Sequence, residues 1–111
     1  MPPPWRINLG GEGEVPGVLN QQGRWVLRRG YRSSRGSRTF AQLVNAGHQF
    51  LLADNVNLPI PDESFDEVIT NSVLIDRNTH LGPGVQSSEI KCILKSGGRW
   101  THDDDLRYVK P

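Results

Sequence analysis

Residues 54–68 read DNVNLPIPDESFDEV, and the pattern of this segment is the clearest indication of the fold. Pro59 and Pro61 hold the connection extended, because the residue before a proline is driven away from the helical region. After the turn that follows, Phe65 is placed to anchor the chain in a core. The apolar residues at 67–70 then have the length and composition of a buried strand. The stretch therefore predicts an extended connection that enters a strand.

The segment EIKCILKSGGRW, at residues 89–100, continues the pattern. It lies mostly within residues 85–95, where Ile90, Ile93 and Leu94 fall on one face of an amphipathic helix. The two glycines that follow permit the positive φ angle of a helix exit. A final strand then begins at residues 99–101. Strand, helix, Gly-Gly and strand predict a right-handed βαβ unit.

The N-terminal half begins with the same kind of unit. Residues 6–9 form a short strand candidate that runs directly into the loop GGEGEVPG at residues 10–17. A second short strand is predicted at residues 18–20. A strand followed by a glycine loop is the order that a ligand-binding turn requires.

A short helix is predicted over residues 39–45, with Ser37 as its N-cap. Apolar runs at residues 50–53 and 73–75 add strand character before and after residues 54–68. Continuous apolar strands that alternate with helices are typical of a parallel sheet with both faces covered. The sequence therefore predicts an α/β fold with a mostly parallel sheet and few helices.

The chain has 111 residues, which suits one domain over residues 1–111 and leaves no room for a second core. No stretch approaches the roughly 18 apolar residues of a membrane span. The N-terminus lacks the charged and apolar regions of a signal peptide, so neither feature is expected. Cys92 is the one cysteine, which excludes an internal disulfide and a thiolate metal cluster, and no metal is expected.

The net charge of +1 hides a division between the two halves. Residues 1–50 hold seven arginines against two glutamates, whereas residues 51–111 carry a net charge of −4. Most of the positive charge lies in the segment 23–38, which has no clear periodicity and is predicted to be a loop. The arginines of this segment are Arg24, Arg28, Arg29, Arg32, Arg35 and Arg38.

Residues 54–68 and 89–100 together resemble the middle of class I S-adenosylmethionine-dependent methyltransferases. In that family an acidic residue follows the third strand, Leu-Pro-x-x-Asp-x-Ser-Phe-Asp precedes the fourth, and a later helix ends in Leu-Lys-x-Gly-Gly. The resemblance implies a small, truncated Rossmann-like sheet. Because the chain ends near the expected close of the fifth strand, the family's last helix and antiparallel strands are expected to be absent.

The resemblance also implies a cofactor site for S-adenosylmethionine. A glycine loop lets the backbone approach a cofactor. The acid that binds ribose at the end of the family's second strand is replaced here by Gln21 and Gln22. Whether the cofactor binds is left open. The residues expected to contact it are Gly10, Gly11, Gly13, Asp54 and Asn55.

A second, narrower resemblance concerns residues 76–90 and 98–103, which look like the short C-terminal modules of bacterial Rhs-type and contact-dependent-inhibition polymorphic toxins. It implies secretion as part of a larger carrier, action in the cytoplasm of the target cell and neutralisation by a dedicated immunity protein. Without that setting, a cytoplasmic location is expected.

Acid–base chemistry is predicted for Asp76, His80 and His102, which follow two successive strands of the expected sheet. Two histidines and a carboxylate can cleave RNA, one histidine taking the 2′-hydroxyl proton and the other protonating the leaving oxygen. Alternatively, these residues bind a divalent metal, or Asp76 and His80 only fix the turns of their loop. The aspartates at 103–105 are either solvated surface or a contact with the immunity protein.

The arginine segment favours nucleic acid, because arginine pairs bidentately with phosphate and Trp25 or Tyr31 could stack on an unpaired base. Alternatively it docks onto the acidic half of the chain or onto an acidic partner. The function expected from the sequence is a polymorphic-toxin effector with RNase-like action. Its rivals are a true S-adenosylmethionine-dependent methyltransferase and a non-catalytic interaction module.

Overall fold

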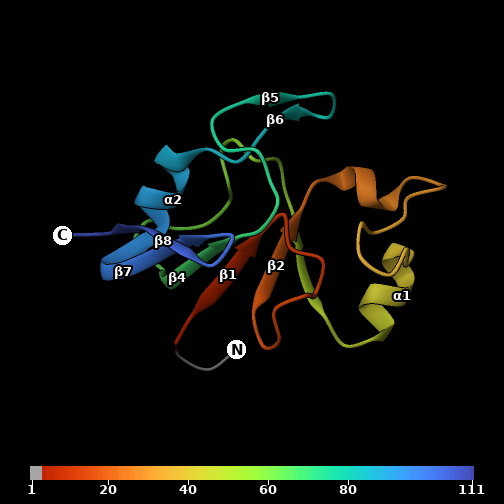
Figure 1. Cartoon of the computed structure of the whole chain (residues 1–111), viewed down its shortest axis with the longest axis horizontal. Coiled ribbons are helices and arrows are strands. Elements are labelled where there is room, and N and C mark those ends of the chain that lie inside the picture. Colours follow the sequence, from red (N-terminus) through yellow and green to blue (C-terminus); the bar gives the residue numbers. More distant parts are fainter. Residues whose placement is uncertain (1–3) are drawn as a thin grey trace.

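The computed structural model describes residues 4–111 and contains a six-stranded sheet in the order β3-β2-β1-β4-β7-β8 (Figure 1). Its strands are β1 (Arg6–Leu9), β2 (Leu19–Gln22), β3 (Gln49–Leu52), β4 (Phe65–Thr70), β7 (Leu94–His102) and β8 (Asp105–Val109). The helices are η1 (Arg24–Leu27), α1 (Phe40–Asn45) and α2 (Ser87–Ile93), and β5 (Asn78–Thr79) pairs with β6 (Gly82–Pro83) in a separate hairpin.

Neighbouring strands from β3 to β7 are all parallel, and only β8 runs antiparallel, against β7. The prediction of an α/β fold with a mostly parallel sheet and few helices is confirmed. The chain first builds outward from β1 through β2 to β3, and then crosses to the other side of β1 to add β4. The strand order therefore reverses between β1 and β4.

The two α-helices lie against opposite faces of the sheet. Ile7 and Val68 are paired across β1 and β4, and both belong to the core cluster that contains Ile90 and Ile93 of α2. On β3, Phe50 points to the other face, where its ring meets Phe40 of α1 edge-on at 5.0 Å. Because strand side chains alternate between faces, α1 and α2 cannot share one.

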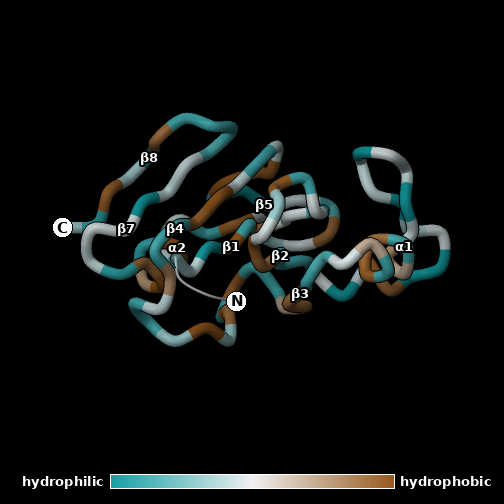
Figure 2. The backbone as a smooth tube through the Cα atoms, turned by 90° about the horizontal axis from the view of Figure 1, so that it is seen from below, coloured by the Kyte–Doolittle hydropathy of each residue, from teal (hydrophilic) through white to brown (hydrophobic). Residues whose placement is uncertain are grey.

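The main core lies between α2 and the centre of the sheet. Ile7, Val68 and Ile90 are fully buried there, and the same cluster includes Leu58 from the long connection before β4 and Phe65, the first residue of β4. Each such side chain stabilises the fold by roughly 1.5–3 kcal/mol relative to exposure. The core cluster contains no residue of the connection between η1 and α1, which Figure 2 shows mostly in teal and white, the colours of hydrophilic and intermediate residues.

The N-cap of α1 is Thr39, so the prediction of Ser37 was wrong. The Thr39 hydroxyl accepts a hydrogen bond from the backbone of Gln42, whose side chain in turn accepts one from the Thr39 N–H. This reciprocal capping box satisfies two backbone donors at once. Ser37 instead adopts a positive φ of 50° two residues earlier.

Helix α2 ends at Ile93, earlier than predicted, because Leu94 already has an extended ψ of 137°. The glycines expected at the helix exit lie inside β7, opposite the register shift between Phe65 and Glu67. Gly97 has a φ of 79° there, and a Cβ on Gly98 would stand 2.8 Å from a backbone oxygen. The glycines therefore shape a bulge where β7 meets β4.

Two further expectations were wrong. Residues 73–75 form no strand; Ile75 makes only a single bridge to Val85. The sheet does have an antiparallel edge, because residues 103 and 104 turn the chain with φ angles of 49° and 69° and lead it back as β8. Positive φ angles at both central residues suit the right-handed twist of the paired strands.

Candidate ligand-binding cleft

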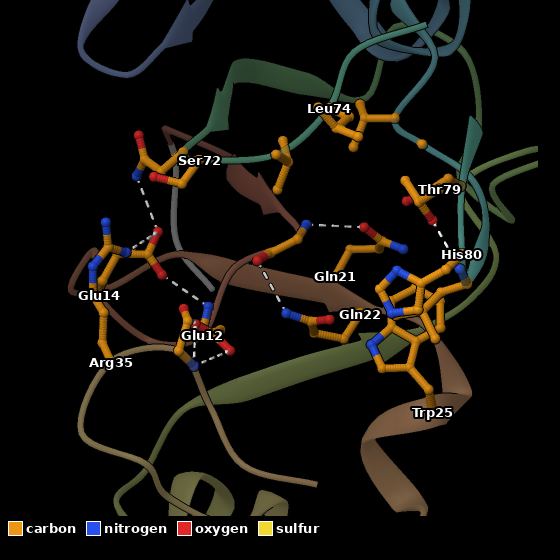
Figure 3. Close-up of a pocket in the computed structure, with 18 residues that line it drawn as sticks. Glu12, Glu14, Gln21, Gln22, Trp25, Arg35, Ser72, Leu74, Thr79 and His80 are labelled. Carbon is orange, nitrogen blue, oxygen red and sulfur yellow. Dashed lines mark hydrogen bonds and ion pairs between the residues drawn. The ribbon is translucent and has the colours of Figure 1, made fainter. Parts of the chain in front are cut away.

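A cleft of about 540 Å³ opens at the carboxyl ends of β1, β2 and β4, where the strand order reverses. Open parallel sheets bind ligands at this position, because the loops on either side diverge there. Its lining comprises Gly10, Glu12, Glu14, Gln21, Gln22, Trp25, Ser34, Arg35, Asn55, Asn71, Ser72, Val73, Leu74, Thr79, His80, Leu81, Gly84 and Val85. Figure 3 shows a charged end at Glu14 and Arg35 and a ring-bearing end at Trp25 and His80.

Glu14 carries the charge at the first end. Its carboxylate accepts hydrogen bonds from the side-chain amides of Asn8 and Asn71, the latter over 3.0 Å, and lies 3.7 Å from the guanidinium of Arg35. Burial acts to raise the pKa of Glu14, but the hydrogen bonds from Asn71, the Glu12 N–H and Asn8 outweigh it and hold the pKa below 4.5. Glu14 is therefore a fixed, ionised group at neutral pH.

Glu12 fastens the arginine segment to the glycine loop. Its carboxylate accepts hydrogen bonds from the Tyr31 hydroxyl over 2.9 Å and from the backbone and hydroxyl of Ser34. Burial and the neighbouring Glu12 carboxylate raise the pKa of Tyr31 far above its usual range. The Tyr31 hydroxyl therefore remains protonated and is committed to this contact.

The two glutamines at the end of β2 hold the glycine loop closed. The Gln22 side-chain amide donates to the carbonyl oxygens of Gly10 and Gly11 over 3.0 and 3.1 Å, and the Gln21 side-chain oxygen accepts from the Gly10 N–H. Figure 3 shows the remaining oxygen of Gln22 turned away from the loop, toward the side of Trp25 and His80. The end of β2 thus presents a neutral acceptor, the Gln22 side-chain oxygen, rather than a carboxylate.

The glycine loop also keeps its own N–H groups occupied. The N–H of Gly10 donates to Gln21, that of Gly11 to the Asn8 carbonyl, and that of Glu12 to Glu14. The Gly13 N–H donates to the Asn20 side chain over 3.2 Å. Four successive N–H groups are therefore committed within the protein, and the loop is not a ready phosphate cradle.

Of the residues predicted to contact a cofactor, Gly10 and Asn55 line the cleft. Asn55 also donates to the Pro83 carbonyl over 2.9 Å and so ties the end of β3 to the β5–β6 hairpin. Gly11 and Gly13 lie in the loop but do not line the cleft, because they pack against Asn8 and His48. Asp54 is exposed beside Asn55.

The structure places the three predicted acid–base residues in different surroundings. His80 lines the cleft, whereas the Asp76 carboxylate accepts hydrogen bonds from the N–H and the hydroxyl of Ser87, the first residue of α2. These two contacts with Ser87 hold the pKa of Asp76 below 3.8. His102 lines a separate cavity of about 260 Å³ and lies 2.8 Å from the Thr70 hydroxyl. The two histidines do not meet in one cavity.

All six arginines of the segment are exposed, and Arg35 alone of them lines the cleft. Glu14, Asn71 and the Arg35–Glu14 pair were not predicted as parts of a site. One signal was present: Glu12 and Glu14 are the two acids in residues 1–50. A second signal was the position of Asn71, which follows β4 as Gly10 follows β1 and so lies at the same edge of the sheet.

Comparison with known proteins identifies no matching family model, curated protein or solved structure. Neither α-helix within residues 4–111 is long and apolar enough to cross a membrane. Over the same residues, no group of three histidine, cysteine or acidic side chains is arranged to hold a metal ion.

Proposed function

We propose that this chain binds S-adenosylmethionine and transfers its methyl group, on a methyltransferase-like, Rossmann-like scaffold. One observation carries the proposal: a single cleft at the reversal of strand order has an ion pair, Glu14 and Arg35, at one end and the rings of Trp25 and His80 at the other. The sequence resemblance of residues 54–68 and 89–100 and the reversal of strand order between β1 and β4 support the proposal.

The ionic end matches the amino-acid part of that cofactor. An α-ammonium group can pair with the fixed carboxylate of Glu14, and an α-carboxylate can pair with the guanidinium of Arg35. The two side chains lie 3.7 Å apart at their nearest charged atoms, close enough to receive both ends of one zwitterion. Asn71 keeps Glu14 oriented for this contact.

The other end matches the nucleoside part. Trp25 and His80 offer ring faces to adenine, and the free oxygen of Gln22 can accept a hydrogen bond from a ribose hydroxyl. The occupied N–H groups of the glycine loop suit a nucleoside without phosphates. The volume of about 540 Å³ lies within the range of ordinary small-molecule sites.

The methyl transfer depends on how the cleft positions the cofactor. When bound, the cofactor would supply an electrophilic methyl group for transfer to a nucleophilic acceptor, with the carbon–sulfur electron pair left on sulfur and the acceptor proton released to water. Glu14 and Arg35 fix one end of the cofactor, and Gln22 and Trp25 fix the other. Holding both ends would align the reacting centre, and such orientation lowers the barrier to the transfer.

Calorimetry tests the proposal. S-adenosylmethionine and S-adenosylhomocysteine are titrated into the protein, with ATP as a matched adenine nucleoside that carries phosphates. We expect the two sulfur compounds to bind and ATP to bind at least tenfold more weakly. If S-adenosylmethionine at millimolar concentration gives no heat of binding, cofactor binding is refuted. If ATP binds equally well, the conclusion that the glycine loop does not favour phosphate is refuted.

Transfer itself is measured with tritiated methyl groups, using total RNA, DNA and cell protein as acceptors. The same RNA is resolved on a gel beside the His80→Ala and His102→Ala variants. Methyl incorporation into intact acceptor supports the proposal. Cleavage that depends on both histidines supports instead the RNase-like toxin expected from the sequence, and neither reaction is expected from a non-catalytic interaction module. The toxin setting and its immunity protein stay predictions.

A further inference from the structure

The arginine segment, residues 23–38, is the most strongly charged surface feature of the chain. No acidic residue occurs between positions 15 and 53, so the six arginines have no neighbours of opposite charge in the sequence. Each of them is exposed. Within residues 4–111, Arg35 alone of the six pairs with a carboxylate, that of Glu14.

The segment does not dock onto the acidic half of the chain. Glu14, its one ionic partner, belongs to the N-terminal half, and the side chain of Arg32 donates to the Ser37 carbonyl within the segment itself. Five positive charges therefore face solvent. Exposed arginines without counter-charges raise the local concentration of a polyanion.

The segment is fixed to the cleft at both of its ends. Trp25 near its start lines the cleft, and Ser34 and Arg35 near its end line it as well. The Glu12 carboxylate also holds the segment against the glycine loop, by accepting hydrogen bonds from Tyr31 and Ser34. Figure 1 shows the connection leaving the end of β2, extending away from the sheet and returning toward α1. The charges are thus carried on a loop whose base forms part of the cleft wall.

We propose that the methyl acceptor is a nucleic acid, whose phosphates bind the arginine segment while one of its nucleotides reaches the cleft. The inference rests on the proposed function. Arginine guanidinium groups pair bidentately with phosphate oxygens. The cofactor-binding positions Glu14 and Arg35 are separate from Arg28 and Arg29, so the two binding events are separable by mutation.

The test measures binding of a fluorescein-labelled mixed-sequence RNA of about 20 nucleotides and its DNA counterpart, by anisotropy over a series of salt concentrations. The variant is Arg28→Gln/Arg29→Gln. Its matched control is Arg99→Gln/Arg107→Gln, which removes the same charge from exposed positions on β7 and β8. For single strands each lost phosphate contact reduces the slope of log K against log salt by about 0.7, so we expect a reduction of about 1.4 in the variant and none in the control.

The possible outcomes distinguish nucleic-acid recognition from a non-specific charge effect and from binding to a lipid surface. A loss of at least tenfold in affinity confined to the Arg28/Arg29 variant, with unchanged calorimetry for S-adenosylmethionine, supports the inference. Equal losses in variant and control show a non-specific charge effect and overturn it. Equal arginine-dependent binding to vesicles containing phosphatidylserine also overturns it, in favour of a lipid surface. Absence of cofactor binding together with arginine-dependent RNA binding refutes the proposed function while leaving nucleic-acid recognition in place.

Discussion

The side-chain amide of Asn71 donates a hydrogen bond to the carboxylate of Glu14 over 3.0 Å. Asn71 follows β4 and Glu14 lies in the loop after β1, so this bond joins the two strands between which the sheet order reverses. It spans the point at which an open sheet divides to admit a ligand. The bond therefore fixes the charged group of the cleft in place before any ligand arrives.

Replacing Glu14 by Gln is expected to weaken S-adenosylmethionine binding about ten- to a hundredfold, because a hydrogen bond to a charged group contributes roughly 1.5–3 kcal/mol. Calorimetry measures the change. Glu67→Gln is the matched control, since Glu67 is also partly buried and ion-paired, with Arg6, but lies outside the cleft. Similar losses in both variants would show that Glu14 acts on the fold rather than on the ligand.

The depressed pKa of Glu14 predicts a loss of stability in acid. A carboxyl whose pKa is lower in the folded protein than in the unfolded chain stabilises the fold fully above the unfolded value, here 4.5, and this stabilisation is lost as the pH falls through the folded value. Urea unfolding at several pH values between about 7 and 3 should therefore show the advantage of wild type over Glu14→Gln shrinking below 4.5. A difference that stays constant down to about pH 3 would contradict the assigned hydrogen bonds.

The capping box of α1 predicts that Thr39→Ala destabilises the protein by about 1 kcal/mol, the usual cost of losing an N-cap side chain. Ser37→Ala is expected to change the free energy of unfolding by less than about 0.5 kcal/mol, because Ser37 is exposed and caps nothing. Urea denaturation of the two variants measures both values. A larger loss of stability in Ser37→Ala than in Thr39→Ala would show that Ser37 is the N-cap of α1.

Strand and helix positions could be predicted because they depend on local patterns. The apolar runs around Val68 and Ile90 determine which residues are buried, and these runs alone were enough to identify β4 and α2. The predicted ends of the helices were less accurate. Both Ser37 and Thr39 can act as an N-cap, and the choice depends on which of them forms a reciprocal pair of hydrogen bonds with Gln42. Gly97 and Gly98 likewise suit either a helix exit or a strand bulge.

The cleft was predictable only in part, because its residues come from separate loops. The glycine loop and Asn55 follow strands and could be identified from their order in the chain. The pairing of Arg35 with Glu14 depends on the path of residues 23–38 back toward the glycine loop. That segment has no periodicity from which its path could be predicted. His80 lies in the turn of the β5–β6 hairpin, whereas His102 is the last residue of β7, and the two side chains line different cavities.

Gln22 lies at the end of β2, and its contacts with the glycine loop explain why a carboxylate does not suit that position. Its amide nitrogen donates to two carbonyl oxygens of the glycine loop, so Gln22→Glu would place a nearly buried carboxylate against those oxygens. We expect a loss of at least about 4 kcal/mol in the free energy of unfolding, because two hydrogen bonds of about 0.5–1.5 kcal/mol each are lost and a buried charge is left unpaired, which costs about 3–5 kcal/mol. Gln42→Glu is the control, since there the side chain uses its oxygen, which Glu retains, and the change should be below about 0.5 kcal/mol. Urea denaturation compares the two variants, and equal stabilities would show that the amide nitrogen of Gln22 does not hold the loop.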